Sequence, residues 1–381
     1  MGVLFLKKNR LLFLISLLLM VGLVLGACGT DEEDTTEGTE DTTDTTDTEE
    51  GTDTETEAAD FKAGMVTDIG GVDDKSFNQS AWEGLVAFGE DNGLSKGSGI
   101  DYVQSANDAD YLPNLNRLVQ QDYNLVFGIG YLLAEAVSEV AGQNPDTNFA
   151  IVDSVVEGDN VASITFQEHQ GSFLVGVAAA LKTESNKVGF VGGVEGDLIK
   201  KFEAGFEAGV KSVDPSIEVV SQYADSFGAP DKGKAIAASM YNSGVDVIYH
   251  ASGGTGNGVF AQAKDIKNAD PDAYVWVIGV DRDQHEEGVI GDTNVTLTSM
   301  VKRVDIAVQS VSQQALDGEF PGGEVLAFGI AEDGVGVAQT NEEAYTAEIN
   351  DAVEEWKQKI LGGEVEVPAT DDELAAYLES L

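Results

Sequence analysis

Two phenylalanines stand in loops that are otherwise polar, where an aromatic ring can stack on a flat ligand. Phe77 lies in "GVDDKSFNQ" (71–79) and Phe227 lies in "YADSFGAPDKG" (223–233), and each loop follows a strand-like run. Either ring alone is explained equally well as buried loop packing. One such ring in each of two similar halves predicts a flat ligand held between the two rings.

Carboxylates stand at the ends of the strand-like runs. Asp68 ends the first run, and Asp153 and Asp281 end two similar segments, 125–153 and 247–281. Both segments follow one plan: an apolar strand, a glycine turn, a helix, an "NPD" or "DPD" bend, a second apolar strand and the aspartate. Capping of the following turn is the alternative role for either aspartate alone. Their equivalent positions favour matched residues on opposite walls of a cleft.

A glycine-rich turn, "GGTGNG" (253–258), opens a helix after a strand and includes Gly254. No Lys-Ser/Thr follows it, so it is not a Walker loop, and its spacing differs from G-x-G-x-x-G. Its glycines permit close backbone approach, and the free N–H groups of a helix start can bind oxygen. A plain tight turn remains the alternative.

These residues are positioned by an α/β pattern that occurs twice. Strand-like runs alternate with amphipathic helical segments, and near-continuous apolar strands indicate parallel sheets covered on both faces. In the first half the strands are expected at 61–68, 101–106, 124–130, 148–154 and 161–166. In the second half they are expected at 187–193, 217–225, 245–252 and 274–281. The pattern predicts two Rossmann-like lobes with a cleft between them.

The lobes are expected to be discontinuous, joined by a hinge of several strands near Phe166, Val295 and Pro321. The segment "VTLTSMVKR" (295–303) is expected to return the chain to the first lobe and to bring Lys302 close to the cleft. The predicted boundaries are 61–165 and 298–320 for the N-terminal lobe, and 166–297 and 321–381 for the C-terminal lobe. The segment 341–381 reads as helical decoration.

The N-terminus predicts export. Basic residues precede an apolar run from 11 to 25 that ends in "LGAC", which is typical of a secretory signal (1–27) rather than a spanning helix. Cys28 is the single cysteine, so no intramolecular disulfide is available to it. "LGAC" resembles the bacterial lipobox, which implies a lipidated Cys28 and a protein anchored to the membrane outside the cytoplasm. An ordinary signal peptide is the alternative.

Residues 28–60 predict a disordered, extended tether. From 31 to 60 there are 15 acidic residues and no basic ones, and a segment with so little apolar surface cannot offset its chain entropy. A weak metal-binding tract is the alternative reading. The remaining chain carries a formal charge of about −35, which excludes nucleic acid as a partner.

Enzyme signatures are missing from the sequence. It has no G-x-S-x-G elbow, and His169, His250 and His285 lack H-E-x-x-H spacing, so we expect loop or surface histidines, no metal and no cofactor. Paired carboxylates in the cleft leave open a lipid-anchored hydrolase that cleaves an N-glycosidic bond. A signalling lipoprotein that binds a sugar or another small ligand is a further alternative.

Several long motifs resemble the Bmp (basic membrane protein) family of lipoproteins over residues 61–340. They are "GGVDDKSFNQSAWEGL", "FGIGYLLAEAV", "FAIVDS", "VASITFQEHQGSFLVGVAAAL", "KVGFVGGV", "IKKFEAGFEAGV", "SGGTGNGV", "VIGVDRDQ" and "TLTSMVKRVDIAV". The resemblance implies a type I periplasmic-binding-protein fold, and a nucleoside receptor that delivers its ligand to an ABC permease with a separate ATPase. We expect a monomer that closes about its hinge.

The resemblance also implies a role for each site residue. Phe77 and Phe227 stack on the two faces of the base, and Asn78 and Asp153 bind its edge. The ribose is held by Asp68, Asp281, Lys302 and the backbone near Gly254. Because no arginine falls in a glycine-rich phosphate loop, neutral nucleosides, purines above all, are favoured over nucleotides.

Overall fold

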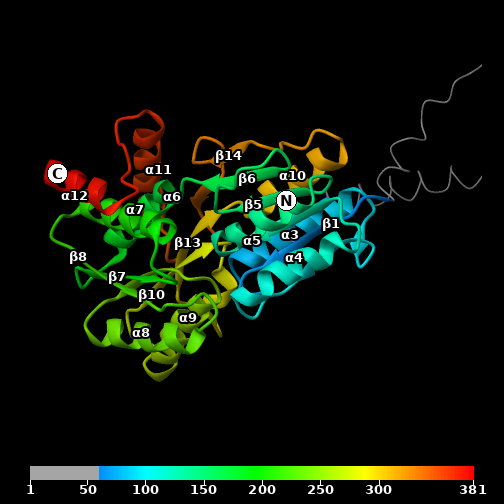
Figure 1. The fold of residues 1–381 in the computed structure, drawn as a ribbon. Coiled ribbons are helices and arrows are strands. Elements are labelled where there is room, and N and C mark those ends of the chain that lie inside the picture. The colour runs from blue at the N-terminus through cyan, green and yellow to red at the C-terminus, as the bar shows by residue number, and fades with distance from the viewer. Residues whose placement is uncertain (1–59) are drawn as a thin grey trace, which may run out of the picture. The chain divides into compact units, whose positions relative to one another are not determined.

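The computed structural model describes residues 60–381, which include two predominantly parallel sheets and the helices that cover them (Figure 1). The predicted signal peptide, Cys28 and the tether up to residue 59 lie outside the described residues. None of the helices in residues 60–381 is both long enough and apolar enough to cross a membrane.

The N-terminal lobe contains a seven-stranded sheet in the order β14-β6-β5-β4-β1-β3-β2, and every neighbouring pair is parallel. Its strands are β1 (Ala63–Thr67), β2 (Ser95–Lys96), β3 (Gly99–Val103), β4 (Leu125–Ile129), β5 (Asn148–Val152), β6 (Val161–Phe166) and β14 (Val325–Phe328). Its helices are α3 (Phe77–Asp91), α4 (Tyr111–Val119), α5 (Ala134–Gln143) and α10 (Val304–Leu316). The central strands β1 and β4 are buried along their whole length, which explains their continuous apolar sequence.

The C-terminal lobe contains a six-stranded sheet in the order β15-β13-β10-β9-β7-β8. Its strands are β7 (Lys187–Gly192), β8 (Glu218–Tyr223), β9 (Val247–Ala251), β10 (Trp276–Asp281), β13 (Thr296–Lys302) and β15 (Val335–Val337), of which β15 is antiparallel to β13. Its helices are α6 (Glu168–Lys182), α7 (Asp197–Val213), α8 (Pro230–Asn242), α9 (Gly256–Ala269), α11 (Ala347–Leu361) and α12 (Asp371–Ser380). A short hairpin, β11 (Val289–Ile290) and β12 (Thr293–Asn294), lies beside this lobe.

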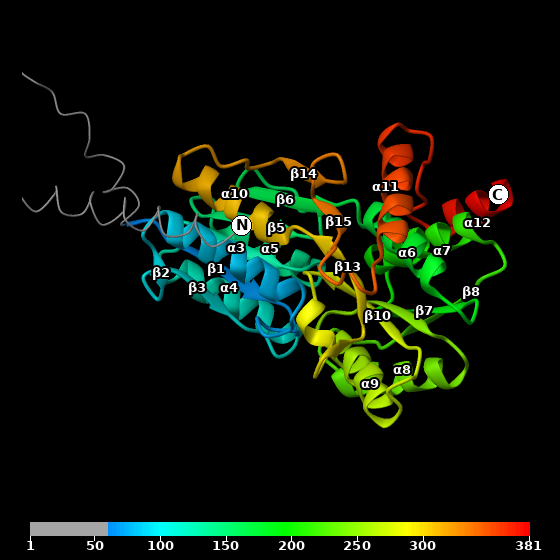
Figure 2. The same cartoon turned by 180° about the vertical axis from the view of Figure 1, so that it is seen from behind.

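Helices cover both faces of each sheet (Figure 2). In the C-terminal lobe α6 and α7 pack together on one face, and α8 and α9 pack together on the other. In the N-terminal lobe α4 and α5 cover one face while α3 packs against α10 on the opposite side. Helix α11 rests on α6, and α12 rests on α7, so the predicted decoration of residues 341–381 extends the C-terminal lobe.

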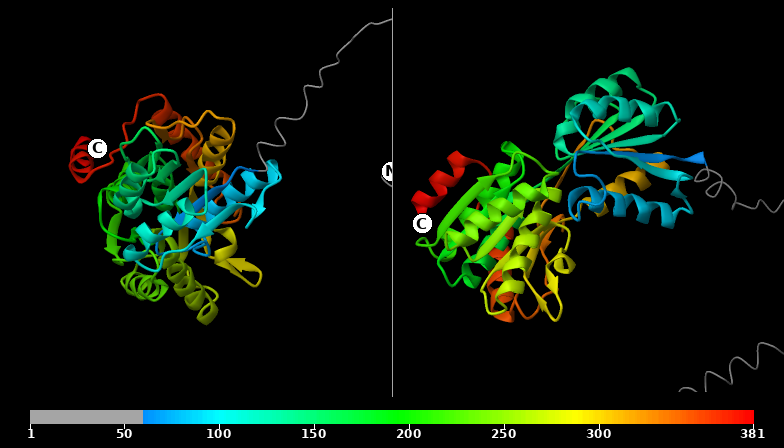
Figure 3. Two further views of the ribbon diagram at one scale, coloured as in Figure 1. Left: turned by 45° about the vertical axis from the view of Figure 1, so that its right-hand side comes forward. Right: turned by 90° about the horizontal axis from the view of Figure 1, so that it is seen from below.

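Strand pairing corrects two of the expected lobe boundaries. Strand β13 pairs with β10 as far as Val301 and with β15 at Lys302, so the chain leaves the C-terminal lobe after Lys302 and not at residue 298. Strand β14 pairs with β6, so residues 325–328 belong to the N-terminal sheet although a boundary was expected at residue 321. The chain crosses between the lobes after β6, between β13 and α10, and between β14 and β15, as the right-hand view of Figure 3 shows.

Candidate functional site

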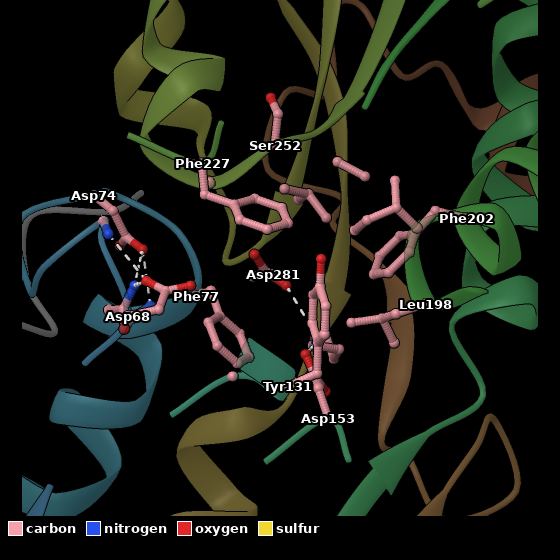
Figure 4. Close-up of a pocket in the computed structure, with 18 residues that line it drawn as sticks. Asp68, Asp74, Phe77, Tyr131, Asp153, Leu198, Phe202, Phe227, Ser252 and Asp281 are labelled. Atoms are coloured by element: carbon pink, nitrogen blue, oxygen red, sulfur yellow. Dashed lines mark hydrogen bonds and ion pairs between the residues drawn. The ribbon is translucent and has the colours of Figure 1, made fainter. Parts of the chain in front are cut away.

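A cavity lies where the carboxyl ends of the two sheets face each other (Figure 4). The N-terminal lobe contributes Asp68, Gly70, Asp74, Phe77, Asn78, Gly130, Tyr131 and Asp153. The C-terminal lobe contributes Leu198, Ile199, Phe202, Phe227, Ala251, Ser252, Gly253, Val280, Asp281 and Lys302.

The cavity brings together most of the residues predicted from the sequence. The predicted residues that line it are Asp68, Phe77, Asn78, Asp153, Phe227, Asp281 and Lys302. Gly254 does not line the cavity. It is buried, and its neighbour Gly253 lines the cavity instead. The glycine turn supports the Phe227 loop, because the Thr255 N–H donates to the carbonyl oxygen of Phe227 (3.0 Å).

Asp153 and Asp281 occupy equivalent positions at the ends of strands. Asp153 directly follows the last residue of β5, and Asp281 is the last residue of β10. Both have a left-handed backbone, with φ of 67° and 66°, a conformation that few residues other than glycine adopt. The shared backbone conformation turns both carboxylates toward the ammonium of Lys302. The structure therefore supports the matched walls that the duplicated segments predict.

Lys302 ends β13 and lies among carboxylates from both lobes. Its Nζ is 2.6 Å from Asp153 Oδ2, 3.8 Å from Asp281 Oδ1 and 4.0 Å from Glu168 Oε1, and the side chain is buried. Burial acts to lower the pKa of Lys302, but the three carboxylates outweigh it and the pKa is raised. The ammonium also lies 4.7 Å from the centre of the Phe77 ring.

The loop before α3 is organised by buried carboxylates. Asp74 accepts the backbone N–H groups of Ser76, Asn78 and Gln79, and in this way it caps the start of the helix. Asn78 Nδ2 donates to Asp68 Oδ1 (2.7 Å) and to Asp74 Oδ2 (3.0 Å). These contacts fix the side chains that follow the first strand.

The buried carboxyls of the cavity are electrostatically costly. Burial raises the pKa of Asp68 to about 6, and burial likewise raises the pKa of Asp281 to about 6. Behind the cavity, burial raises the pKa of Glu168 to about 7, although Lys302 opposes that shift. A ligand that donates hydrogen bonds to such carboxylates stabilises their charged form.

Phe77 and Phe227 face the cavity from different lobes (Figure 4). Phe77 is the first residue of α3, and its ring both lines the cavity and packs in the hydrophobic core. Room for Phe227 comes from Gly193, where a Cβ would lie 2.3 Å from the ring. Tyr131 meets Phe227 edge-on, with ring centroids 6.2 Å apart.

Tyr131 and an apolar wall from α7 also line the cavity, although the sequence did not single them out. Tyr131 follows β4 and Gly130, which is the same signal of a ring after a strand that singled out Phe77. Leu198, Ile199 and Phe202 come from the first turns of α7, whose pattern read only as an amphipathic helix. No sequence signal separates these three from ordinary core residues.

The expectation for the histidines was wrong in one case. His250 lies in β9, fully buried, and its Nε2 is 3.0 Å from Gln284 Oε1. Burial lowers the pKa of His250 to about 4, so the ring is neutral near pH 7. Within residues 60–381 no group of three or more His, Cys, Asp and Glu side chains is arranged to hold a metal ion.

Direct contacts hold the two lobes together around the cavity. Ser76 Oγ donates to Asp281 Oδ2 (2.5 Å), and Gln284 Nε2 donates to the carbonyl oxygen of Lys75 (2.9 Å). At the rim, Arg282 binds both carboxylate oxygens of Glu83 at 2.8 Å. The structure is thus a closed arrangement of the lobes.

Two parallel-sheet lobes that enclose a cavity at the carboxyl ends of their strands define a solute-binding protein of type I architecture. A solved solute-binding protein of an ABC transporter system from Aeropyrum pernix has this arrangement, with a TM-score of 0.73 and 26% identity, over 84% of this chain and 99% of that one.

The sequence comparisons identify the family. The family described as "ABC transporter substrate-binding protein PnrA-like" (Bmp) matches residues 61–371, and the chain belongs to it. A Listeria innocua protein named CD4+ T-cell-stimulating antigen is 50% identical over 95% of this chain and 99% of its own length. The "ABC transporter nucleoside-binding protein BmpA" of Lactococcus lactis is 46% identical over 81% of this chain and 90% of its own.

Proposed function

We propose that this protein is the nucleoside-binding component of an ABC importer, anchored by a lipid on Cys28 outside the cytoplasm. The observation that carries the proposal is the cavity itself, which combines two aromatic rings from opposite lobes with buried carboxylates and one ammonium. The name of the Lactococcus relative supports the same ligand class. The tether of acidic and threonine residues holds the binding domain away from the lipid surface.

The roles of the side chains follow from their chemistry. Phe77 and Phe227 stack on the two faces of the base, and each stacked face contributes roughly 1–3 kcal/mol. Asn78 and Asp153 bind the base edge. Asp68 and Asp281 accept hydrogen bonds from ribose hydroxyls, because a carboxylate has enough lone pairs to serve both groups of a cis-diol. Lys302 offsets the charge of these carboxylates, and the backbone near Gly254 completes the sugar site.

Binding proceeds by closure of the lobes. The ligand first contacts one lobe, and the other lobe then closes over it through the chain crossings that follow β6, β13 and β14. The contacts of Ser76 and Gln284 with the opposite lobe stabilise the closed form. The closed protein, as a monomer, then docks on a permease whose ATPase is a separate chain.

A calorimetric screen of nucleosides, free bases, sugars and nucleotides tests the proposal. The expected result is stoichiometric binding of nucleosides, with purine nucleosides bound most tightly and nucleotides bound weakly or not at all. Binding of sugars alone would contradict the proposal and favour a sugar receptor. Incubation of the protein with inosine, followed by chromatography, separates a receptor from a hydrolase: a receptor returns intact inosine, whereas a hydrolase releases hypoxanthine.

A further inference from the structure

The loop before Phe77 is held by two amide side chains of the other lobe. Gln284, which follows β10, donates through Nε2 to the carbonyl oxygen of Lys75 (2.9 Å). Asn257, on α9, donates through Nδ2 to the carbonyl oxygen of Asp74 (3.1 Å). Lys75 has a left-handed backbone with φ of 64°, a conformation that is uncommon for a residue with a side chain. The C-terminal lobe thus binds two successive carbonyls of the N-terminal lobe in one particular backbone conformation.

Contacts inside the C-terminal lobe fix the amide of Gln284. Its Oε1 accepts the Val280 N–H (2.9 Å) and lies 3.0 Å from Nε2 of His250. The reversed amide would direct its N–H groups at the Val280 N–H, with no acceptor between them. Gly279 leaves room for the side chain, because a Cβ there would lie 2.7 Å from Gln284 Oε1. Since all of these groups belong to one lobe, the donor is oriented independently of the other lobe.

His250 contributes to this orientation through one tautomer. Gln284 Oε1 can only accept, so the proton of the neutral imidazole is on Nε2. Nδ1 is then an acceptor, and it lies 3.4 Å from the hydroxyl oxygen of Ser252. The ring has space because residue 256 is glycine, where a Cβ would lie 2.1 Å from the ring. This buried histidine therefore has a defined partner on each side.

We propose that Gln284 and Asn257 form a preset catch for the peptide backbone at residues 74 and 75, with His250 as the positioning residue of Gln284. The inference rests on the proposed function, in which capture requires the lobes to close. None of these three side chains lines the cavity, so the catch does not touch the ligand. Opening has to break both hydrogen bonds whichever nucleoside is bound. The catch therefore slows release by the same factor for every ligand.

Gln284→Glu tests the catch in stopped-flow measurements of inosine and adenosine release from the mature protein. The variant keeps the shape of the side chain and its acceptor oxygen, but a carboxylate oxygen replaces the donor to Lys75. Both nucleosides are expected to leave about tenfold faster or more, because a buried carbonyl without its donor is costly. The ratio of their two affinities is expected to stay at the wild-type value. An unchanged release rate, or a different factor for each nucleoside, would overturn the proposal.

Asn257→Asp makes the same change at the second amide, and it is expected to speed release in the same way. Asn257 is only partly buried, so this variant keeps the test available if Gln284→Glu does not fold. Asn160→Asp is the control, because Asn160 donates to three backbone carbonyls inside the N-terminal lobe. It should lower the melting temperature and leave release unchanged. Faster release in Asn160→Asp as well would show that lost stability, and not the catch, is the cause.

Two further variants test the positioning role of His250. His250→Leu removes both ring nitrogens, and release is expected to become faster. His250→Gln places an amide N–H near the position of Nε2–H, so it is expected to restore slow release. Equal release rates in the two variants would refute the positioning role of His250.

The outcomes also separate the catch from the proposed function. If the wild-type protein binds no nucleoside, the proposed function fails. If it binds nucleosides but Gln284→Glu and Asn257→Asp release them at the wild-type rate, the proposed function stands and the catch is refuted.

Discussion

Phe77 serves the core and the cavity at once, which determines how its removal should appear. Its ring is 9% exposed and belongs to the main core cluster, but it also lines the cavity under the Lys302 ammonium. A substitution therefore changes stability and affinity together. The two effects have to be measured separately.

Phe77→Ala is expected to lower nucleoside affinity by roughly 1–3 kcal/mol through lost stacking. It is also expected to lower the free energy of unfolding by about 3 kcal/mol or more, as other Phe→Ala changes in cores do. The control is Phe127→Ala in β4, a fully buried ring that does not line the cavity. That variant should lose stability, but in its folded state it should retain affinity. Calorimetry well below each melting temperature separates the two quantities, and unchanged affinity of Phe77→Ala would contradict the stacking role.

Glu168 gives the ligand-free protein a predictable dependence on pH. Its folded-state pKa is raised to about 7 by burial, so between about pH 4.5 and pH 7 the folded protein binds more protons than the unfolded chain. The contribution of Glu168 to stability is therefore lost as pH rises through this window. Glu168→Gln has no carboxyl to titrate at this position, so it does not show this loss. The free energy of unfolding of the variant minus that of wild type is therefore expected to increase across this window by on the order of 3 kcal/mol.

Urea unfolding at pH 5 and at pH 8 measures this difference. Glu139→Gln, which removes an exposed carboxyl on α5, is the control for a change of charge alone. A stability difference between Glu168→Gln and wild type that is the same at both pH values would refute the assignment.

At the level of single residues, the sequence predicted the polar and aromatic groups that end strands, because such groups are unusual in loops. It could not predict which of their atoms are already used inside the protein. That Asn78 binds Asp68 and Asp74 through its amide nitrogen depends on distances across a folded loop. Glu168 was not singled out, because a glutamate at a helix start is typical of an exposed residue.

Helices α6 and α7 pack closely because glycines remove side chains from their contact. A Cβ at Gly205 would lie 2.2 Å from the carbonyl oxygen of His169, and a Cβ at Gly209 would lie 2.0 Å from that of Phe173. The close approach sets the position of α7, whose first turns supply Leu198 and Phe202 to the cavity.

Gly209→Ala is expected to destabilise the protein by about 1–3 kcal/mol, because the added methyl group forces the two helices apart and this outweighs the better helix propensity of alanine. Gly142→Ala in α5 is the matched control, since its Cβ would meet nothing within 4 Å. That change should be neutral or stabilising by up to about 1 kcal/mol. Differential scanning calorimetry of both variants checks the pair, and equal effects would show that packing is not the cause.

Among the elements, the sequence predicted the long buried strands within one or two residues at most ends, as at β6 and β10. It misplaced the boundary near residue 321 because β14 is a short, partly exposed strand with little apolar pattern. Which sheet such a strand joins is decided by hydrogen bonds to partners more than 30 residues away in the chain.

Across the whole molecule, the ion pair of Arg282 with Glu83 joins the two lobes at the rim of the cavity. Because its two partners belong to different lobes, opening has to break it, so it should slow opening without affecting the folding of either lobe. Arg282→Ala is expected to speed nucleoside release by up to about fivefold, in line with the 1 kcal/mol or less of an exposed pair.

Stopped-flow measurements of release test this prediction. Lys234→Ala removes an exposed ion pair with Asp265 inside the C-terminal lobe, and release should be unchanged. In the double variant Arg282→Ala with Glu83→Ala the effects should not add, and the effect of Arg282→Ala should shrink in high salt. Additive effects would mean that the ion pair of Arg282 with Glu83 does not hold the lobes closed.

Helix α10 belongs to the N-terminal lobe but is synthesised after most of the C-terminal lobe. It lies against α3 so closely that a Cβ at Gly84 would be 2.1 Å from the carbonyl oxygen of Asp305, yet it follows the last strand but one of the other lobe. Until residue 316 has been synthesised, the face of the N-terminal sheet that carries α3 and α10 lacks its second helix. The N-terminal lobe is therefore complete only after most of the C-terminal lobe has been synthesised, so the two lobes cannot be completed one after the other in chain order.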